Sequence, residues 1–200
     1  MIAVPSQPGS LVVVGVGIAL GQTTLEAKAH VEAADKVYYL VSNPSAVLWL
    51  EQLNATAESL YSFYEVGKPR LQSYDDMVDR VVSAVRAGQA VCAAFYGHPG
   101  VFADPGHRAV KVARSEGYPA RMLPGVSAED YLFADLGIDP SRCGCQSYEA
   151  SDFLICGRLF DPTAVNSSPA LTRPPPGTAL RRPPAIAARP SRRPACGTSR

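Results

Sequence analysis

The sequence predicts an α/β fold in which helices flank a mostly parallel sheet. The clearest sign is the apolar run Ala90–Phe95, because six apolar residues without alternation are typical of a strand buried on both faces. Two further apolar runs, Ser10–Val16 and Lys36–Val41, lie nearer the N-terminus. Helix-like segments alternate with these runs, which is the order found in α/β domains. The 200 residues allow one good-sized domain or two small ones.

The segment between the first two strands predicts the first helix. Thr23 or Thr24 can cap it, and apolar residues keep the helical spacing to about Asp35. A strand, a helix and a second strand in this order predict a right-handed βαβ unit whose two strands form a parallel pair.

The other elements follow from periodicity, capping residues and glycine stops. Asp130 is placed to complete a capping box with Ser127, and Gly137 ends the helix that begins there. In order, the sequence predicts a helix over Ser45–Leu53, a short strand or extended segment over Glu58–Phe63, a helix over Tyr74–Ala87, the strand Ala90–Phe95, a helix over Asp104–Ser115, a strand over Ala120–Leu123, a helix from Ser127, and two short extended pieces, Gln146–Ala150 and Asp152–Ile155.

The composition changes abruptly near residue 166. Up to Asn166 the chain has 12 basic and 18 acidic residues, a net charge of −6, whereas Ser167–Arg200 has seven Arg and no acidic residue. This segment holds eight of the 18 prolines and no aromatic residue, so it cannot bury enough apolar surface to offset its ordering entropy. We therefore expect residues 167–200 to be disordered. An Arg-rich tail can bind nucleic acid or an acidic surface, but most such tails are simply solvated, and we expect no nucleic-acid partner.

Nothing in the sequence directs the protein to a membrane or to secretion. The N-terminus has no basic n-region, and the apolar stretch Leu11–Leu20 is too short to span a bilayer. The five cysteines are unevenly placed, which argues against a disulfide framework. The spacing of Cys143-Gly-Cys145 is too close for a common zinc knuckle. We expect free thiols, no metal and a cytoplasmic location.

The glycine-rich loop that begins at Gly15-Val16-Gly17 does not match the nucleotide-binding motifs. The dinucleotide fingerprint requires a third glycine one residue earlier than Gly21, and an acidic residue after the second strand, where the chain has Ser42-Asn43-Pro44. The pattern of a nucleoside-triphosphate P-loop is also missing.

The stretch Tyr96–Phe102, which reads Tyr-Gly-His-Pro-Gly-Val-Phe, is the first candidate for a functional loop. Its two glycines and proline break the preceding strand and let the backbone pass close to a ligand. In an open α/β sheet the ligand crevice lies at the carboxyl ends of the strands. The pattern therefore indicates a cofactor-binding loop, with an ordinary strand-to-helix turn as the alternative.

A second candidate is a group of three phenols and one guanidinium: Tyr61, Tyr64, Arg70 and Tyr74. Intervening glycine and proline residues indicate that much of this stretch is not regular helix, and functional residues are common on such loops. The alternative is that the tyrosines are amphipathic edges of the core and Arg70 is a surface charge.

Three signatures in this order resemble the tetrapyrrole methylase superfamily, whose members transfer methyl groups from S-adenosyl-L-methionine. They are Val13–Gly17 with its following loop, Tyr96–Phe102, and Pro124-Gly125-Val126-Ser127. The usual family motif at the second site is Gly-Asp-Pro, and here His98 replaces the Asp. This departure and the tyrosine cluster look most similar to the borosin branch, the omphalotin-type peptide backbone α-N-methyltransferases. The similarity covers residues 9–163.

The resemblance implies a methyl donor, roles for named residues and no metal. Arg70 and Tyr74 would be catalytic, and Tyr61 and Tyr64 would shape the peptide site. A tyrosinate would take the amide proton, and a guanidinium beside it would lower the pKa of the phenol and offset the developing negative charge. The residues that would bind the donor are Tyr96, Gly97, His98, Val101, Phe102, Ser127, Ala128 and Gln146.

The resemblance also implies a peptide substrate, in cis or in trans, and a homodimer. The family fold has two α/β domains with the cofactor between them, and the match ends near Thr163, so we expect the N-terminal half of that fold. The tail then resembles an out-of-frame or misspliced continuation, and the activity of this chain is open. The alternatives are a tetrapyrrole C-methyltransferase of the precorrin or uroporphyrinogen type and a non-catalytic binding or dimerisation module.

Overall fold

The computed structural model describes residues 9–162 and 164–167, and it contains a five-stranded parallel sheet with the strand order β3-β2-β4-β1-β5. The predicted α/β fold is confirmed. The strands are β1 (Ser10–Gly15), β2 (Lys36–Leu40), β3 (Glu58–Ser59), β4 (Ala90–Phe95) and β5 (Ala120–Met122), and a second small sheet pairs β6 (Cys145–Ser147) with β7 (Val165–Ser167). The helices are α1 (Leu25–Ala33), α2 (Pro44–Leu53), α3 (Arg70–Arg86), α4 (Asp104–Ser115), α5 (Ala128–Leu136) and α6 (Ala150–Cys156), with short 3-10 helices η1 (Leu20–Gln22) and η2 (Leu60–Phe63).

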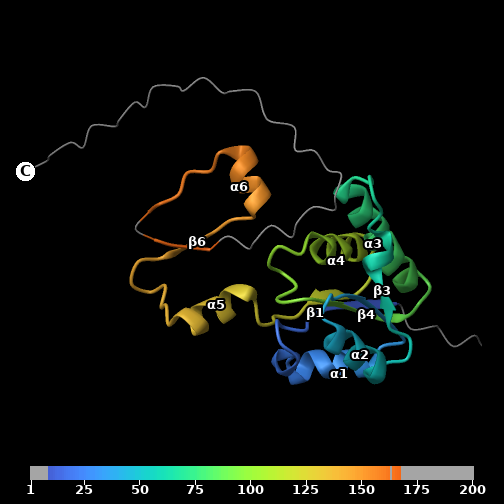
Figure 1. The fold of residues 1–200 in the computed structure, drawn as a ribbon. Helices are drawn as coiled ribbons and strands as arrows, with labels where there is room; N and C mark the ends of the chain where they lie inside the picture. The colour runs from blue at the N-terminus through green and yellow to red at the C-terminus, as the bar shows by residue number, and fades with distance from the viewer. Residues whose placement is uncertain (1–8, 163, 168–200) are drawn as a thin grey trace, which may run out of the picture.

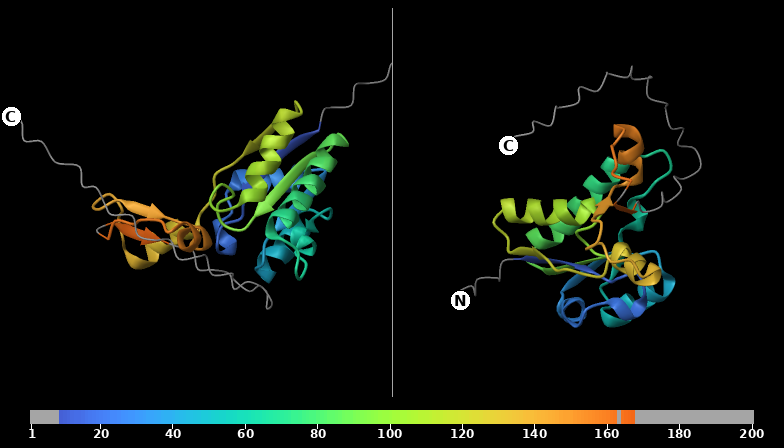
Figure 2. Two further views of the ribbon diagram at one scale, coloured as in Figure 1. Left: turned by 90° about the horizontal axis from the view of Figure 1, so that it is seen from above. Right: turned by 90° about the vertical axis from the view of Figure 1, so that its left-hand side faces the viewer.

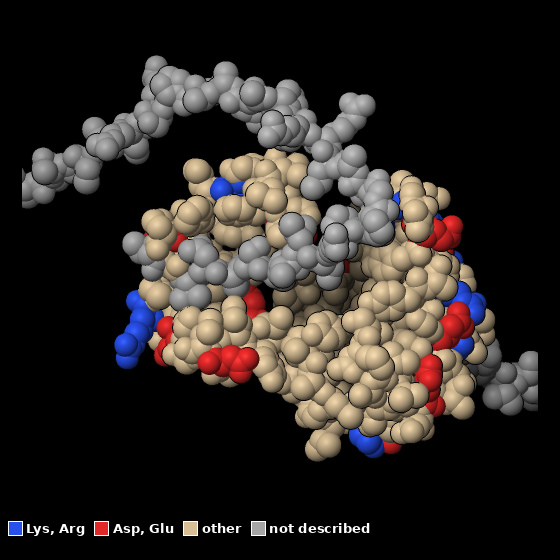
Figure 3. Space-filling view, viewed as in Figure 1, with Lys and Arg blue, Asp and Glu red and all other residues tan. Residues whose placement is uncertain are grey.

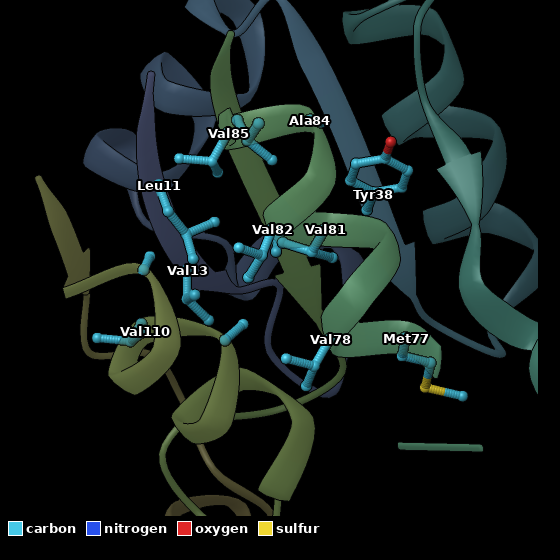
Figure 4. Close-up of a cluster of buried hydrophobic side chains, with 14 of the residues drawn as sticks. Leu11, Val13, Tyr38, Met77, Val78, Val81, Val82, Ala84, Val85 and Val110 are labelled. Atoms are coloured by element: carbon cyan, nitrogen blue, oxygen red, sulfur yellow. The ribbon is translucent and has the colours of Figure 1, made fainter. Parts of the chain in front are cut away.

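The large sheet lies between two helical layers. Helices α1 and α2 cover one face, and α3 and α4 cover the other (Figure 1). Strand β4 is buried on both sides: Val91, Ala93 and Phe95 join the core under α3 and α4, while Cys92 and Ala94 join the core under α1 and α2. Figure 4 shows the first of these cores, in which side chains of β1 meet the apolar face of α3. The prediction that Ala90–Phe95 is a doubly buried strand is confirmed.

The predicted parallel pair of the first two strands is not present. β1 and β2 run parallel in one sheet, but β4 lies between them and pairs with both along its length. Cys92, for example, lies opposite Val12 of β1 and Val37 of β2. The central place suits β4 because it is the strand without an exposed face. Adjacency in the sequence therefore did not translate into adjacency in the sheet.

Helix α3 begins at Arg70, four residues before the predicted start at Tyr74. Pro69 is its N-cap and accepts the hydrogen bond from the amide of Ser73 at 3.2 Å. Proline suits a helix start because the first amides of a helix have no partner within it. The residues from Tyr64 to Pro69 are not regular helix, as predicted, but Pro69 caps the start of α3 and does not interrupt a helix. Arg70 and Tyr74 are one helical turn apart on the same face.

The segment predicted as extended over Glu58–Phe63 pairs as a strand only at Glu58 and Ser59. The hydroxyl of Ser59 then accepts a hydrogen bond from the amide of Tyr61 and starts the 3-10 helix η2. Because β3 runs parallel to its neighbours, η2 lies at the carboxyl edge of the sheet, where the other strand-terminal loops also lie.

The second of the two predicted C-terminal extended pieces is a helix. The segment Asp152–Ile155 belongs to α6, whose start is capped by Glu149 accepting from the amide of Asp152 at 2.7 Å, and whose end is the left-handed Gly157. These caps outweigh the strand preference of the apolar residues between them. Figure 2 shows that α6 and the small sheet stand apart from the large sheet.

Ser167 ends β7, and the rest of the segment predicted to be disordered, 168–200, lies outside the described residues. Among the described helices, none combines the length and the apolar character that crossing a membrane requires.

Candidate active site

Three glycine-containing turns meet at the carboxyl edge of the large sheet. Gly15 ends β1, Gly97 follows β4 and Gly125 follows β5. The amide of Gly17 donates to the carbonyl of Gly97 at 3.3 Å, and the amide of Gly97 donates to the carbonyl of Gly17 at 3.0 Å. A Cβ atom on Gly15 would lie 2.2 Å from the carbonyl oxygen of Gly97, and one on Gly125 would lie 3.3 Å from the same oxygen. The structure thus joins the three sequence signatures into one backbone cradle.

The loop after β4 presents two aromatic rings beside this cradle. The side chains of Tyr96 and Phe102 are 45% and 49% exposed. Val101, which directly precedes Phe102, is half-buried. Phe102 has a φ of 52°, a left-handed conformation that is unfavourable for a residue with a Cβ atom. Backbone strain of this kind concentrates at ligand sites. The loop is therefore a better candidate for a ligand-binding segment than for an ordinary turn.

The start of α5 adjoins the same loop. Ser127 is buried and caps α5: its hydroxyl accepts from the amide of Asp130, while its own amide and hydroxyl donate to the Asp130 carboxylate at 2.7 and 2.8 Å. The predicted capping box is confirmed. These hydrogen bonds, with a smaller contribution from nearby His98, hold the pKa of Asp130 below its usual range. Ala128 is the exposed first residue of the helix, and the effect of His98 on Asp130 places His98 near this turn.

Gln146 is not brought to this region. It lies on β6, and its side-chain oxygen accepts a hydrogen bond from the amide of Asp161 at 2.7 Å. The side chain is thus committed to the small sheet unit, which stands apart from the cradle (Figure 2). The sequence could not indicate this because the partner of Gln146 is a backbone amide 15 residues away.

The predicted tyrosine cluster is present as a contiguous group on η2 and α3. The ring centroids of Tyr61 and Tyr64 are 5.8 Å apart, and those of Tyr64 and Tyr74 are 6.3 Å apart in an edge-on arrangement. Partial burial, the adjacent Tyr74 phenol and a hydrogen bond with it raise the pKa of Tyr64 above its usual range, and these effects outweigh the lowering by Arg70. Arg70 thus lowers the pKa of the neighbouring phenol, as predicted for a guanidinium beside a phenol, but at Tyr64 burial and Tyr74 prevail and the hydroxyl stays protonated at neutral pH.

Arg70 is exposed at the start of α3, and its guanidinium forms no ion pair within the part of the chain that the structure describes. The same end of α3 is tied to α4, because Arg108 forms ion pairs with both Asp75 and Asp104. Helix α4 directly follows the loop Tyr96–Phe102. The ion pairs therefore connect the helix that carries Arg70 and Tyr74 to the loop beside the cradle.

The surface is hollowed between the sheet domain and the unit formed by α5, β6 and α6 (Figure 3). The wall of this hollow toward the sheet domain is mostly free of charged side chains, whereas acidic groups gather on α5. Among the residues described, no group of His, Cys, Asp and Glu is arranged to hold a metal ion.

Sequence reasoning included Gly97 in the candidate site but left out three other glycines of the cradle, Gly15, Gly17 and Gly125. These were recognised as parts of motifs but not as neighbours at one junction of the backbone. Their signal was their position directly after apolar runs, where a strand ends and the backbone turns. The exposed aromatics and the close backbone approach suit a donor such as S-adenosyl-L-methionine, which combines a flat ring system, a sulfonium cation and a carboxylate.

The chain matches a known family model and is similar to known proteins. Residues 10–157 match the model of the family described as Tetrapyrrole (Corrin/Porphyrin) Methylases. The chain is 55% identical over 151 residues to the methyltransferase/ribosomally synthesized cyclic peptide dendrothelin A precursor of Dendrothele bispora, covering 75% of this chain and 36% of that protein. It is 52% identical over 163 residues to the corresponding omphalotin A precursor of Omphalotus olearius, covering 81% and 38%. The chain thus spans little more than a third of these relatives.

The fold has a counterpart among solved structures. The crystal structure of uroporphyrin-III-C-methyltransferase from Thermus thermophilus resembles it with a TM-score of 0.56 and 24% identity, over 73% of this chain and 62% of that one. At this identity the likeness shows the fold alone.

Proposed function

Because the chain belongs to the tetrapyrrole methylase family, as its motifs predicted, we propose that it takes part in methyl transfer from S-adenosyl-L-methionine to the backbone amides of an apolar peptide. The observation that carries this proposal is the meeting of Gly15, Gly97 and Gly125 beside the exposed loop Tyr96–Phe102. Both relatives described above are named as methyltransferase and cyclic peptide precursors, which supports a peptide substrate over a tetrapyrrole.

The loop and the cradle would hold the donor. Glycines at the cradle let the backbone approach it closely, and the rings of Tyr96 and Phe102 offer faces that attract a cation. Ser127 and Ala128 would form the facing turn, with His98 and Val101 completing the loop. When bound, S-adenosyl-L-methionine supplies a methyl group on a positively charged sulfur.

The group on η2 and α3 would prepare the amide. An amide nitrogen is a poor nucleophile because its lone pair is delocalised into the carbonyl, so the N–H proton must leave and negative charge develops on the oxygen. The permanently charged Arg70 would offset that charge. Tyr74, acting as a tyrosinate, would receive the proton and become a neutral phenol, and protonated Tyr64 would donate a hydrogen bond to it. Tyr61 would shape the peptide site.

Titration calorimetry of the full chain with S-adenosyl-L-methionine tests the first half of this proposal. We expect saturable heat, because the glycines of the cradle let the backbone approach the donor and the rings of Tyr96 and Phe102 offer it aromatic faces. No heat at millimolar donor would instead favour a binding or dimerisation module without catalytic function.

Mass spectrometry of a supplied apolar peptide tests the second half. We expect products heavier by whole methyl groups, on backbone nitrogen, from the chain and donor together. A uroporphyrinogen incubated in parallel is the control. Methylation of the ring compound and not of the peptide would overturn the choice of substrate.

We further propose that the chain acts in the cytoplasm as a homodimer. The four cysteines within the described residues carry free thiols, which supports a reducing compartment.

Helices α5 and α6 expose several large apolar side chains that a second copy would cover: Tyr131, Leu132, Leu136, Leu154 and Ile155. We expect sedimentation equilibrium to give twice the mass of the chain, and Leu136→Lys to shift it toward the monomer. A monomer at all concentrations would contradict the dimer.

A further inference from the structure

We propose that His107, which lies on α4 outside the residues assigned to the donor site, is a positioning residue for the donor loop. His98 binds the amide of Gly100 and His107 binds its carbonyl oxygen. The two contacts fix the segment that presents Val101 and Phe102. The consequence for donor binding rests on the function proposed above, but the loop geometry does not.

Two hydrogen bonds define this clamp. The amide of Gly100 donates to Nδ1 of His98 at 2.9 Å, and Nε2 of His107 lies 2.9 Å from the carbonyl oxygen of Gly100. A carbonyl oxygen only accepts, so Nε2 of His107 must carry a hydrogen. A backbone amide only donates, so Nδ1 of His98 must carry none. The two contacts therefore assign the protonated nitrogen of each ring.

Packing restrains Gly100 as well. A Cβ atom on Gly100 would lie 3.1 Å from Cε1 of His98 and 3.2 Å from the sulfur of Met122, so the glycine is wedged between an imidazole and a thioether. The amide of Val101 donates to the carbonyl of His98 at 3.1 Å and closes the turn.

The clamp explains how the strain at Phe102 persists. A non-glycine residue stays in the left-handed region only when its surroundings hold it there. Gly100 is fixed two residues before Phe102, and α4 begins two residues after it. His107, near the start of α4, bonds back to Gly100 and so joins the two fixed points. Phe102 is thereby confined between them.

Amide hydrogen exchange in the full chain, followed by NMR, tests the clamp without any ligand. We expect His107→Ala to lower the protection factors of the Gly100 and Val101 amides about fivefold, the population effect of one ordinary hydrogen bond. His107→Gln should restore them, because its side-chain amide donates from a position similar to Nε2. Lys111→Ala, one turn further along α4, is the matched control and should change neither. Equal protection in His107→Ala and the wild type would overturn the proposal.

Substitutions at His98 separate the clamp from a merely structural role. In His98→Asn the side-chain oxygen accepts like Nδ1, so the protection factor of the Gly100 amide should be kept, whereas His98→Leu has no acceptor and should lower it about fivefold. Equal protection in His98→Leu and the wild type would contradict the assigned role of His98.

Donor affinity gives the last readout. We expect the Kd for S-adenosyl-L-methionine to rise about fivefold in His107→Ala and to recover in His107→Gln. If the wild type does not bind the donor while the exchange results hold, the proposed function fails and the clamp stands. If donor binding is intact but His107→Ala leaves it unchanged, the link from clamp to donor site is wrong.

Discussion

Replacing Arg70 by alanine is expected to abolish methyl transfer while leaving donor binding unchanged. Arg70 is the exposed first residue of α3, and its charge influences the phenol of Tyr64 directly. A permanent charge placed where negative charge develops typically contributes 10²–10³ in rate, so the loss should be about that large. Single-turnover methylation of a supplied peptide, read by mass spectrometry, measures the rate, and calorimetry measures the Kd of the donor.

The neighbouring phenol provides a companion to this experiment. Tyr74→Phe keeps the ring that packs against Tyr64 but removes the hydroxyl, so the same loss of rate is expected without a loss of stability. Lys28→Ala is the control for removing one positive charge, because among the described residues Lys28 forms an ion pair with Glu32 alone, on α1, which covers the opposite face of the sheet (Figure 1). Arg70→Ala and Tyr74→Phe variants that both lose the donor would show that these residues are structural.

Gly15→Ala is expected to destabilise the fold by about 3 kcal/mol, as overpacking in a rigid interior does. The added Cβ would lie 2.2 Å from the Gly97 carbonyl oxygen and 2.8 Å from Cδ of Pro99. Neither atom can retreat freely, because the Gly97 carbonyl also accepts from Gly17 across the two loops. The cradle should open, and donor binding should weaken with it.

Urea unfolding followed by circular dichroism measures this effect. At a typical dependence on denaturant, the midpoint should fall by roughly 1–2 M. Gly21→Ala is the matched control, since no atom lies within 4 Å of a Cβ at that position and its backbone is not left-handed. If Gly15→Ala unfolds at the same urea concentration as Gly21→Ala, the close approach of the two loops is not the constraint described above.

Local signals predicted several elements to the residue. The helix Asp104–Ser115 and the strand Ala90–Phe95 have the predicted bounds, and Ser127 and Asp130 form the predicted capping box. Each depends on periodicity or on contacts within four residues of the chain. The start of α3 was misplaced because Pro69 can either break a helix or begin one, and the neighbouring residues do not distinguish the two.

The candidate site was likewise predicted where its signals are local in the sequence and missed where they depend on the fold. Sequence motifs identified the loop Tyr96–Phe102 and the tyrosine cluster, because glycines after a buried strand and grouped phenols are visible in the chain itself. They did not show that Gln146 is held by a backbone amide in another unit. Nor did they show that partial burial raises the pKa of Tyr64 against the effect of Arg70, since burial is a property of the folded molecule.

The sequence alone determined the fold class and the family, and it indicated the segments proposed to bind donor and peptide, because apolar period, capping and glycine placement act over a few residues. The tertiary structure decided the strand order, with β4 between β1 and β2. It also decided that Gly15, Gly97 and Gly125 share one junction, and that two histidines hold Gly100. These features depend on contacts between segments far apart in the chain, which only the packing of the complete sheet brings together.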